Sequence, residues 1–309
     1  MKTSFDRFLN RNFALALGAW ALVTGCASSA EETLDRDETA SSTSAPIIGG
    51  QNAVAGQHKW IANVLVNDGG VWRHQCGGAL IAAQWVLTAA HCIANSGGWY
   101  SNTQIRVRLG DYDQTVSEAS EQLKNVTTVW IRDGYNADPN VSPSNYDMAL
   151  IKLSSAATLN SNVNTIALAT QTPPTSCPPS NLSCNDVIAA GWGATAPLNP
   201  PPPTESSNIL QRATIKLRSQ STCNGAEVGA IRSATGSPGL KFDELCVGSS
   251  NGNPGPCKGD SGGPLVRAKS GGGYELVGVS SWGPLYCTSY AVYGSVPAHT
   301  DWIQWVLTH

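Results

Sequence analysis

Short apolar runs separated by glycine and proline recur along this chain, and this pattern limits its fold more than any other feature. The 309 residues include 31 Gly and 18 Pro. The runs between them are rich in Val, Ile and Leu, which is typical of strands joined by many turns. The segments that we expect to be strands are 60–66, 79–87, 105–109, 148–153, 186–190 and 275–280. The sequence therefore predicts an all-β protein with enough core for two domains or one large one.

Two segments depart from this pattern. Residues 298–307 follow Pro297 and place Trp302, Ile303, Trp305 and Val306 at helical spacing, so we expect a short C-terminal helix. Residues 197–203 read PLNPPPP, which cannot lie in a central strand and predicts an exposed polyproline II loop. A ligand for a proline-recognition module is the functional alternative for this loop.

Residues 259–265 read GDSGGPL, a serine between an acid and two glycines. A serine hydroxyl is a poor nucleophile unless a base takes its proton and backbone N–H groups hold the charge that develops on the substrate oxygen. Gly259 lacks a Cβ, so its N–H can approach an oxyanion at a backbone angle that other residues resist. The motif predicts a nucleophilic Ser261, and the alternative is a glycine-rich turn with an incidental serine.

Two upstream segments supply the partners that such a serine needs. Residues 87–92 read LTAAHC and contain His91, and residues 146–153 read YDMALIKL, with Asp147 at the head of an apolar run. Asp147 would hold the imidazole tautomer, His91 would take the serine proton, and Ser261 would attack. We expect the remaining histidines to be ordinary surface or core residues: His58, His74, His299 and His309.

With the order His91, Asp147, Ser261, the chain resembles the chymotrypsin-like (trypsin-fold) serine endopeptidases over residues 47–309, as a bacterial exported member. The resemblance implies two antiparallel β-barrels, expected at 47–170 and 171–309, with the active site in the cleft between them. It also implies a protein or peptide substrate, no cofactor for catalysis, and an oxyanion hole formed by Gly259 and Ser261.

Two other function classes fit less well. A binding protein that kept the fold but lost the chemistry would not need an intact His91, Asp147, Ser261 and Gly259. An α/β-hydrolase would carry a G-x-S-x-G elbow, with its acid and histidine after the serine, whereas both precede it here. Nucleic acid is not an expected partner, because 19 Lys and Arg against 22 Asp and Glu provide no basic field.

The resemblance also implies a specificity pocket. Gly255 stands six residues before Ser261, where trypsin-like members place an acid. A pocket without a carboxylate would leave a buried Arg or Lys unpaired, which costs several kcal/mol, so we expect large apolar or aromatic side chains there. Pro256 and Lys258 flank the pocket. The residues expected to bind substrate are Gly255, Ser281, Trp282, Gly283 and Ala291, with Ser281 also supporting Asp147.

Nine cysteines, an odd number, suggest an exported protein with one cysteine outside the disulfides. The resemblance implies that Cys76 pairs with Cys92, Cys223 with Cys246, and Cys257 with Cys287. Cys177 and Cys184 remain and most simply pair with each other. The family's usual bridge six residues after the nucleophile is absent, because Arg267 stands there. Metal binding is the alternative for these cysteines, and their wide spacing without CxxC pairs argues against it.

The N-terminus is typical of a secretory signal peptide over residues 1–26. Lys2, Arg7 and Arg11 precede an apolar run, 13–23, that is too short to span a membrane. The run ends in VTGC, which resembles a bacterial lipobox, so that Cys26 would be lipidated and would anchor a precursor to the membrane. The alternative is cleavage a few residues later and a freely secreted protein. Residues 27–46 are polar and acidic and predict a disordered linker or propeptide.

Residues 47–50 read IIGG, which resembles the mature N-terminus of the family. The resemblance implies a zymogen that an activating protease cuts before Ile47, so that the new ammonium pairs with Asp260. A buried carboxylate needs such a partner. Pro46 precedes the cut in place of the usual Arg or Lys, which argues against a trypsin-like activator.

Residues 111–121 read DYDQTVSEASE and resemble the family's calcium loop. Calcium favours such clusters of oxygen ligands on loops. Asp111 is one methylene shorter than the usual Glu, and the alternative is a solvated acidic loop. The expected ligands of a structural calcium are the carboxylates of Asp111, Glu118 and Glu121 and the backbone carbonyls of Asp113 and Val116.

Overall fold

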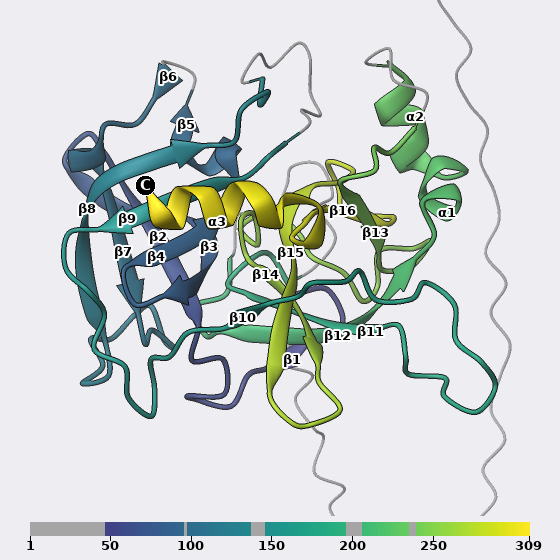
Figure 1. Ribbon diagram of the computed structural model, residues 1–309, viewed down its shortest axis with the longest axis horizontal. Coiled ribbons are helices and arrows are strands. Elements are labelled where there is room, and N and C mark those ends of the chain that lie inside the picture. The colour runs from purple at the N-terminus through teal and green to yellow at the C-terminus, as the bar shows by residue number, and fades with distance from the viewer. Residues whose placement is uncertain (1–46, 96–97, 137–145, 196–205, 235–238) are drawn as a thin grey trace, which may run out of the picture. The chain divides into compact units, whose positions relative to one another are not determined.

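Two six-stranded antiparallel barrels dominate the chain (Figure 1). The computed structural model describes residues 47–95, 98–136, 146–195, 206–234 and 239–309. The first barrel closes in the order β2-β3-β4-β9-β8-β7. Its strands are β2 (Ile61–Asp68), β3 (Val71–Ala82), β4 (Trp85–Thr88), β7 (Ile105–Leu109), β8 (Gln122–Ile131) and β9 (Ala149–Leu153).

The second barrel runs β12-β11-β14-β15-β16-β13, and β13 closes it by pairing with β12. Two short strands join its sheet, β1 beside β12 and β10 beside β15. The segment that follows Ile47 therefore pairs with the second barrel and not the first. The strands of this sheet are β1 (Gln51–Asn52), β10 (Ala167–Leu168), β11 (Asp186–Gly191), β12 (Gln211–Arg218), β13 (Glu244–Val247), β14 (Pro264–Ala268), β15 (Tyr274–Trp282) and β16 (Ala291–Ser295).

The all-β, two-barrel architecture with a C-terminal helix is confirmed, but one expected strand is wrong. Residues 79–87 are not continuous: β3 ends at Ala82 and β4 starts at Trp85. The two strands pair as a hairpin, with Ala79 opposite Leu87 and Leu80 opposite Val86. The turn between them carries neither glycine nor proline, so the apolar pattern runs through it without interruption.

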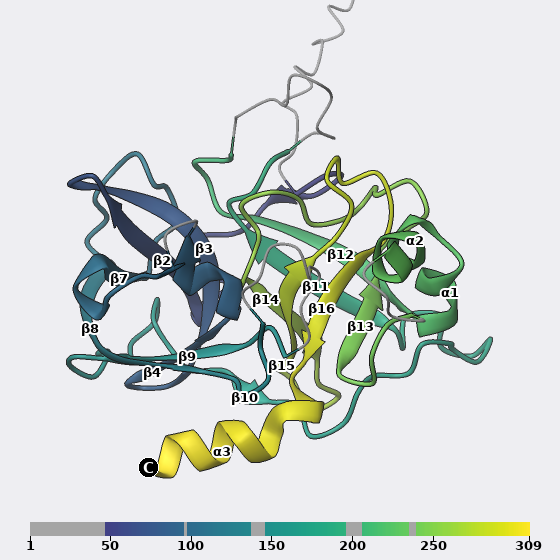
Figure 2. The same ribbon diagram turned by 90° about the horizontal axis from the view of Figure 1, so that it is seen from above.

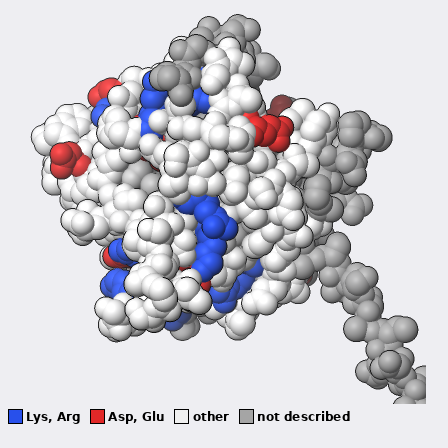
Figure 3. All heavy atoms as spheres, turned by 90° about the vertical axis from the view of Figure 1, so that its right-hand side faces the viewer, with Lys and Arg blue, Asp and Glu red and all other residues white. Residues whose placement is uncertain are grey.

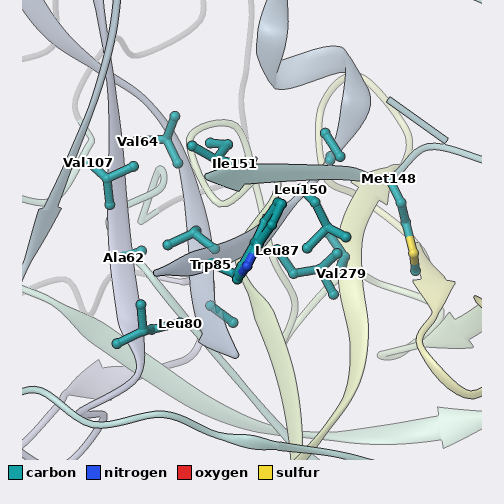
Figure 4. Packing of buried hydrophobic residues seen from close by; sticks show 14 of the residues in the cluster. Ala62, Val64, Leu80, Trp85, Leu87, Val107, Met148, Leu150, Ile151 and Val279 are labelled. Atoms are coloured by element: carbon teal, nitrogen blue, oxygen red, sulfur yellow. The ribbon is translucent and has the colours of Figure 1, made fainter. Parts of the chain in front are cut away.

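The hydrophobic core of the first barrel extends into neighbouring elements. Figure 4 shows Ala62, Val64, Leu87 and Leu150 of this barrel packed in one cluster with Val279 of β15. The helix α3 (Thr300–Thr308) adds Trp302, Ile303 and Val306 to the same cluster. Figure 2 shows α3 projecting from the second barrel to lie along the first. Buried residues of both barrels therefore pack in one common cluster.

The smaller elements lie at the edges. A 3₁₀ turn, Pro297–His299, precedes α3 within the expected C-terminal helix. None of the helices in the described ranges is long and apolar enough to cross a membrane. The other elements are α1 (Gln220–Asn224), α2 (Glu227–Ala234), the strand pair β5 (Ala94–Asn95) and β6 (Gly98–Trp99), and 3₁₀ turns at Ala90–Ile93 and Asn102–Gln104.

Four disulfides brace the loops. They join the pairs that the sequence analysis expected: Cys76–Cys92, Cys177–Cys184, Cys223–Cys246 and Cys257–Cys287. Arg267 forms an ion pair with Glu275 where the family's usual bridge is absent. Four disulfides are typical of proteins that fold in an oxidising compartment.

Charged residues are sparse on one face of the molecule. Figure 3 shows the side at the right of Figure 1, where most atoms are uncharged and Lys and Arg gather in a short stripe. Three expectations lie outside the described residues: the signal peptide with Cys26, the linker 27–46, and the proline-rich loop 197–203.

Candidate active site

His91 sits in the 3₁₀ turn Ala90–Ile93 that directly follows β4. The preceding Ala89 and Ala90 are fully buried, so the small residues of LTAAHC let this turn pack against the barrel. The Cys76–Cys92 disulfide ties the turn to β3. As a result the imidazole is held at the rim of the first barrel, with about a third of its side chain exposed.

Asp147 lies immediately before β9 and accepts hydrogen bonds from two elements. His91 donates twice, from its backbone N to Oδ1 at 2.9 Å and from Nδ1 to Oδ2 at 2.8 Å. The Ser281 hydroxyl of β15 donates to Oδ2 at 2.6 Å. Because Nδ1 must carry the proton in this contact, Nε2 of a neutral His91 is left as an acceptor, the form that a general base requires.

The electrostatics of this pair support that arrangement. Burial by itself would lower the pKa of His91, but the charge and hydrogen bond of Asp147 raise it above its usual value. Burial by itself would raise the pKa of Asp147, but His91 and the Ser281 hydroxyl hold it below its usual value. The carboxylate therefore stays ionised and stabilises the imidazolium that forms during proton transfer.

Ser261 sits on the loop between the Cys257–Cys287 disulfide and β14, at the edge of a cavity. The backbone N–H of Gly77 in β3 donates to the Ser261 carbonyl at 2.8 Å, so the first barrel helps to fix the serine. Ser261 Oγ makes no hydrogen bond to His91 Nε2, which contacts the Cys92 sulfur at 3.8 Å. Catalytic hydrogen bonds are often long without substrate and tighten when it binds.

The loop before the serine offers free donors. Neither the Gly259 N–H nor the Ser261 N–H donates a hydrogen bond to any residue that the structure describes. Gly259 adopts φ +100°, and a Cβ on it would come within 2.9 Å of the Gly193 backbone. Only glycine fits this position, and two free N–H groups on one short loop, separated by a single residue, are the donors that an oxyanion hole requires.

Asp260, between these donors, is almost fully buried. Its carboxylate accepts from two backbone N–H groups, Cys257 at 3.0 Å and Gly193 at 2.9 Å. Burial raises the pKa of Asp260 to about 6, and the two hydrogen bonds only partly offset this. Ile47 is fully buried in the core cluster of the second barrel, with Ala189 and Tyr293.

A cavity of about 290 Å³ opens beside Ser261. Four of the five expected binding residues line it: Ser281, Trp282, Gly283 and Ala291. No carboxylate is among its described lining residues, and Lys258 is the only charged side chain there.

Gly255, the fifth expected residue, does not line this cavity. Its N–H donates to the Ile48 carbonyl, and a Cβ on it would lie 2.7 Å from the Gly252 carbonyl oxygen. A side chain at this position would therefore collide with backbone.

The acidic loop brings three of its expected ligands together. Carboxylate oxygens of Asp111, Glu118 and Glu121 lie within 4.8 Å of one another. Asp111 Oδ1 is buried and has no hydrogen-bond partner among the residues that the structure describes, which fits a ligand atom. Arg108 already lies 3.5 Å from Asp111 and 3.7 Å from Glu121, so a cation would share this cluster with a guanidinium. The carbonyl of Asp113 instead accepts from the Val116 N–H at 3.2 Å, which closes a turn.

Two histidines that were expected to be ordinary surface or core residues make specific contacts in the structure. His74 contacts the carbonyl of Gly259, and His299 pairs with the buried Asp243 at 3.3 Å. His74 and Gly259 are 185 residues apart, so no local pattern could reveal their contact. Only knowledge of the strand pairing brings them together.

Comparison with known proteins agrees with this geometry. The model of the family described as Trypsin matches residues 47–303. Trypsin I-P1 of Gallus gallus is 36% identical over 235 residues, which cover 76% of this chain and 79% of the relative. Serine protease 1 of Canis lupus familiaris is 37% identical over 75% of this chain and 79% of its own length. Trypsin-1 of Salmo salar is 36% identical over 83% of this chain and 89% of its own length.

Proposed function

This chain belongs to the trypsin family of serine endopeptidases, and from that premise we propose that it cleaves peptide bonds after large apolar or aromatic residues through an acyl-enzyme on Ser261. The observation that carries the proposal is the hydrogen-bonded pair of His91 and Asp147, together with Ser261, whose own N–H and that of Gly259 donate to no described residue. Trypsin-family hydrolysis of this kind needs no cofactor.

In the proposed reaction, Ser261 Oγ attacks the carbonyl carbon of the scissile bond while His91 Nε2 takes its proton. The negative charge that develops on the carbonyl oxygen is held by the N–H groups of Gly259 and Ser261. The C–N bond then breaks as His91 returns the proton to the leaving amine. A water molecule, activated by His91 in turn, hydrolyses the ester and releases the acid and free Ser261.

The proposed specificity rests on the charges around the cavity. A substrate Arg or Lys in it would meet Lys258 and no carboxylate, and an unpaired buried cation costs several kcal/mol. A carboxylate at position 255 would also collide with the Gly252 carbonyl. Cleavage after Arg or Lys is the second candidate, favoured by the name trypsin that several relatives carry.

One experiment tests both the chemistry and the specificity. The chain cut before Ile47 is profiled against a peptide library, beside the Ser261→Ala variant. We expect cleavage after Phe, Tyr and Leu, and a loss of about a million-fold in turnover for the variant. Retained activity in Ser261→Ala would disprove the nucleophile, whereas faster cleavage after Arg or Lys would disprove only the specificity.

We further propose that the acidic loop binds a structural calcium through Asp111, Glu118 and Glu121, with backbone carbonyls of Asp113 and Val116. Calcium prefers such oxygen ligands. The clustered carboxylates and the unpartnered Asp111 Oδ1 support this proposal.

We also propose that the protein is exported and made as a zymogen that an activating protease cuts before Ile47. The four disulfides support export. Asp260 is buried, and no cationic side chain of the described ranges pairs with it, which supports pairing with a new Ile47 ammonium. In the proposed organisation, residues 1–26 are a signal peptide, 27–46 a propeptide, 47–170 and 171–309 the two barrels.

We also propose a bacterial lipobox at Cys26, so that activation would have a second consequence, release of the enzyme from the membrane. Because the described disulfides hold nothing before Ile47, the cut would also release the enzyme from a membrane anchor. Labelling cells with a fatty-acid analogue tests this. A precursor without lipid on Cys26 would remove the membrane step and leave the zymogen proposal standing.

A further inference from the structure

We infer that Arg232 and Glu244 are positioning residues for substrate specificity, because their buried ion pair holds the indole of Trp282, part of the wall of the cavity beside Ser261. Neither Arg232 nor Glu244 is among the described residues that line this cavity. The inference rests on the proposed peptide-bond cleavage and assigns control of its specificity to two charges behind the cavity wall.

Strand pairing by itself does not fix the direction of Trp282. Ser280 of β15 lies opposite Tyr293 of β16, and Trp282 lies opposite Val292, so β15 has one extra residue between these two pairs. A bulge of this kind interrupts the regular ladder and changes the direction in which side chains point. The orientation of the indole must therefore come from side-chain contacts.

The carboxylate of Glu244 supplies the first of these contacts. The indole N–H of Trp282 donates to Glu244 Oε1 at 3.0 Å. Arg232 Nη2 forms an ion pair with the same oxygen. The other oxygen, Oε2, accepts from the backbone N–H of Lys241 at 2.7 Å. Because both oxygens have partners, the carboxylate is fixed in place and so is the acceptor that the indole N–H meets.

The guanidinium of Arg232 supplies the second contact, on the face of the ring. Its Cζ lies 4.9 Å from the centroid of the Trp282 ring. A guanidinium over an indole face is attracted by the ring quadrupole, and more strongly where water is excluded. The indole is thus held at its N–H by an anion and at its face by a cation.

The helix α2, which carries Arg232, packs behind the same wall. Its Val228 belongs to a core cluster with Cys246 of β13 and Val292 of β16, and the partly buried Trp282 and Tyr290 pack against this cluster. Figures 1 and 2 both show α1 and α2 beside β13. The helix, the cluster and the indole therefore form one packed unit behind the cavity.

A contribution to stability does not account for this ion pair. Arg232 is 1% exposed and Glu244 is 5% exposed. Burial lowers the pKa of Arg232, and the nearby Asp243 carboxylate opposes this. Replacing a buried ion pair by apolar residues of similar volume is often neutral or stabilising. A cavity rejects a side chain of the wrong size only if its walls do not yield, and contacts of this kind lock such walls.

The test removes the ion pair without leaving a single charge behind. One double variant carries Arg232→Leu and Glu244→Leu, and the matched control carries Arg267→Leu and Glu275→Leu. Arg267 and Glu275 also form an ion pair, but neither is among the described residues that line the cavity. Both double variants are made in the enzyme cut before Ile47. The measurements are the melting temperature, and kcat and KM on two peptides. One peptide carries, before the cut, the residue that the library profile ranks first, and the other carries Ala there.

We expect the Arg232, Glu244 double variant to lower the preference for the first-ranked residue over Ala, taken as the ratio of kcat/KM values, about tenfold. The loss should lie in a higher KM for the preferred peptide, with kcat within about threefold and a melting temperature that is unchanged or higher. The control should keep its preference within about twofold. An unchanged preference, an equal loss in the control, or a fall in kcat on both peptides alike would overturn the inference.

Two single variants decide the matter if the double variant does not fold. Arg232→Lys keeps a cation for Glu244 and for the indole face and should retain the preference within about threefold. Arg232→Met removes the charge and should lower the preference about tenfold. Because the preference is a ratio measured on the same enzyme, it does not depend on the fraction that folds. Equal preferences in these two variants would overturn the inference.

The proposed function can fail separately from this inference. An active Ser261→Ala enzyme would overturn both, whereas an inactive one leaves the Arg232 and Glu244 variants to decide the inference alone. A library profile led by Arg or Lys would overturn only the proposed apolar specificity, because the measured ratio uses whichever residue ranks first.

Discussion

Two buried carboxylates lie on either side of the catalytic chemistry, and the chain supports them in different ways. Asp147 accepts from an imidazole, a hydroxyl and one backbone N–H. Within the described part of the chain, Asp260 accepts from two backbone N–H groups alone. Burial by itself would raise the pKa of both carboxyl groups. The pKa of Asp147 nevertheless lies below its usual value, whereas that of Asp260 rises to about 6.

The difference shows what each carboxylate still needs. The site of Asp147 is complete within the folded chain, because His91, the partner that becomes cationic during proton transfer, is a side chain of the same chain. Among the residues that the structure describes, Asp260 has backbone dipoles but no cation beside it. An unpaired buried charge costs several kcal/mol. We therefore conclude that Asp147 already has all the partners that its catalytic role needs. Asp260 would gain its missing cationic partner, the Ile47 ammonium, through the proposed cut before Ile47.

The largest expected effect is the loss of kcat on substitution of Asp147. Asp147→Asn should lower kcat by about 10⁴ with little change in KM, because the amide favours the wrong tautomer of His91. Steady-state kinetics of the cut enzyme measures this, with Ser281→Ala as a milder control that removes one of three donors. A loss of less than tenfold would mean that Asp147 does not orient His91.

The next largest effect is the loss of kcat/KM on substitution of Asp260 in the enzyme cut before Ile47. In the cut enzyme, Asp260→Asn should lower kcat/KM by about 10² to 10³, since breaking a buried ion pair costs about 3–5 kcal/mol. The same change in the uncut chain should alter its low activity less than threefold. Equal losses in both forms would contradict the proposed pairing with the Ile47 ammonium.

A smaller effect appears in stability against pH for the uncut chain. The folded pKa of Asp260, about 6, lies above the ordinary 3.8, so the folded state binds this proton more tightly. Its contribution is complete below pH 3.8 and is lost as pH rises through 6, in total about 3 kcal/mol. Urea unfolding at pH 4 and pH 7.5 should show Asp260→Asn gaining about that much relative to the unchanged chain.

After the cut, the sign of that difference should reverse, because pairing with an ammonium holds the carboxylate ionised. A pH-independent difference between Asp260→Asn and the unchanged protein in the uncut form would contradict the unpaired burial of Asp260.

Asp111 is intermediate between Asp147 and Asp260 in how far its carboxylate is partnered. The effect expected there, a rise in melting temperature with calcium, is the smallest. It has a guanidinium nearby, yet one buried oxygen lacks a partner. Calcium at ten times its dissociation constant should stabilise the protein by about 1.4 kcal/mol, which raises the melting temperature by roughly 3–5 °C. Glu118→Gln should reduce the response. A melting temperature that is the same with calcium and with chelator would count against the calcium site.

The sequence was sufficient where the pattern is local. Alternating apolar residues predict strands such as Ile105–Leu109, which the structure reproduces residue for residue. Apolar spacing after Pro297 likewise predicts the C-terminal helix. The hairpin at 79–87 was missed because its turn lacks glycine and proline, and α1 and α2 were missed because they are short and weakly amphipathic.

The residues of the candidate site likewise fall into those that local motifs predict and those that depend on distant contacts. GDSGGPL and LTAAHC indicate their chemistry from neighbouring residues, and the structure joins His91 to Asp147 over 56 positions. The contact between His74 and the Gly259 carbonyl depends instead on how the two barrels meet. Gly255 was assigned to the pocket from its spacing to Ser261, but backbone from the adjacent turn occupies the space beside it.

The most direct test of this account is a mass measurement on protein labelled with a fluorophosphonate, which reacts only with an activated serine. We predict that the labelled species begins at Ile47, that the label maps to Ser261, and that the uncut chain labels at least a hundredfold more slowly. Rapid labelling of the uncut chain, or a label on any other residue, would contradict the claim that the cut before Ile47 completes the site around Ser261.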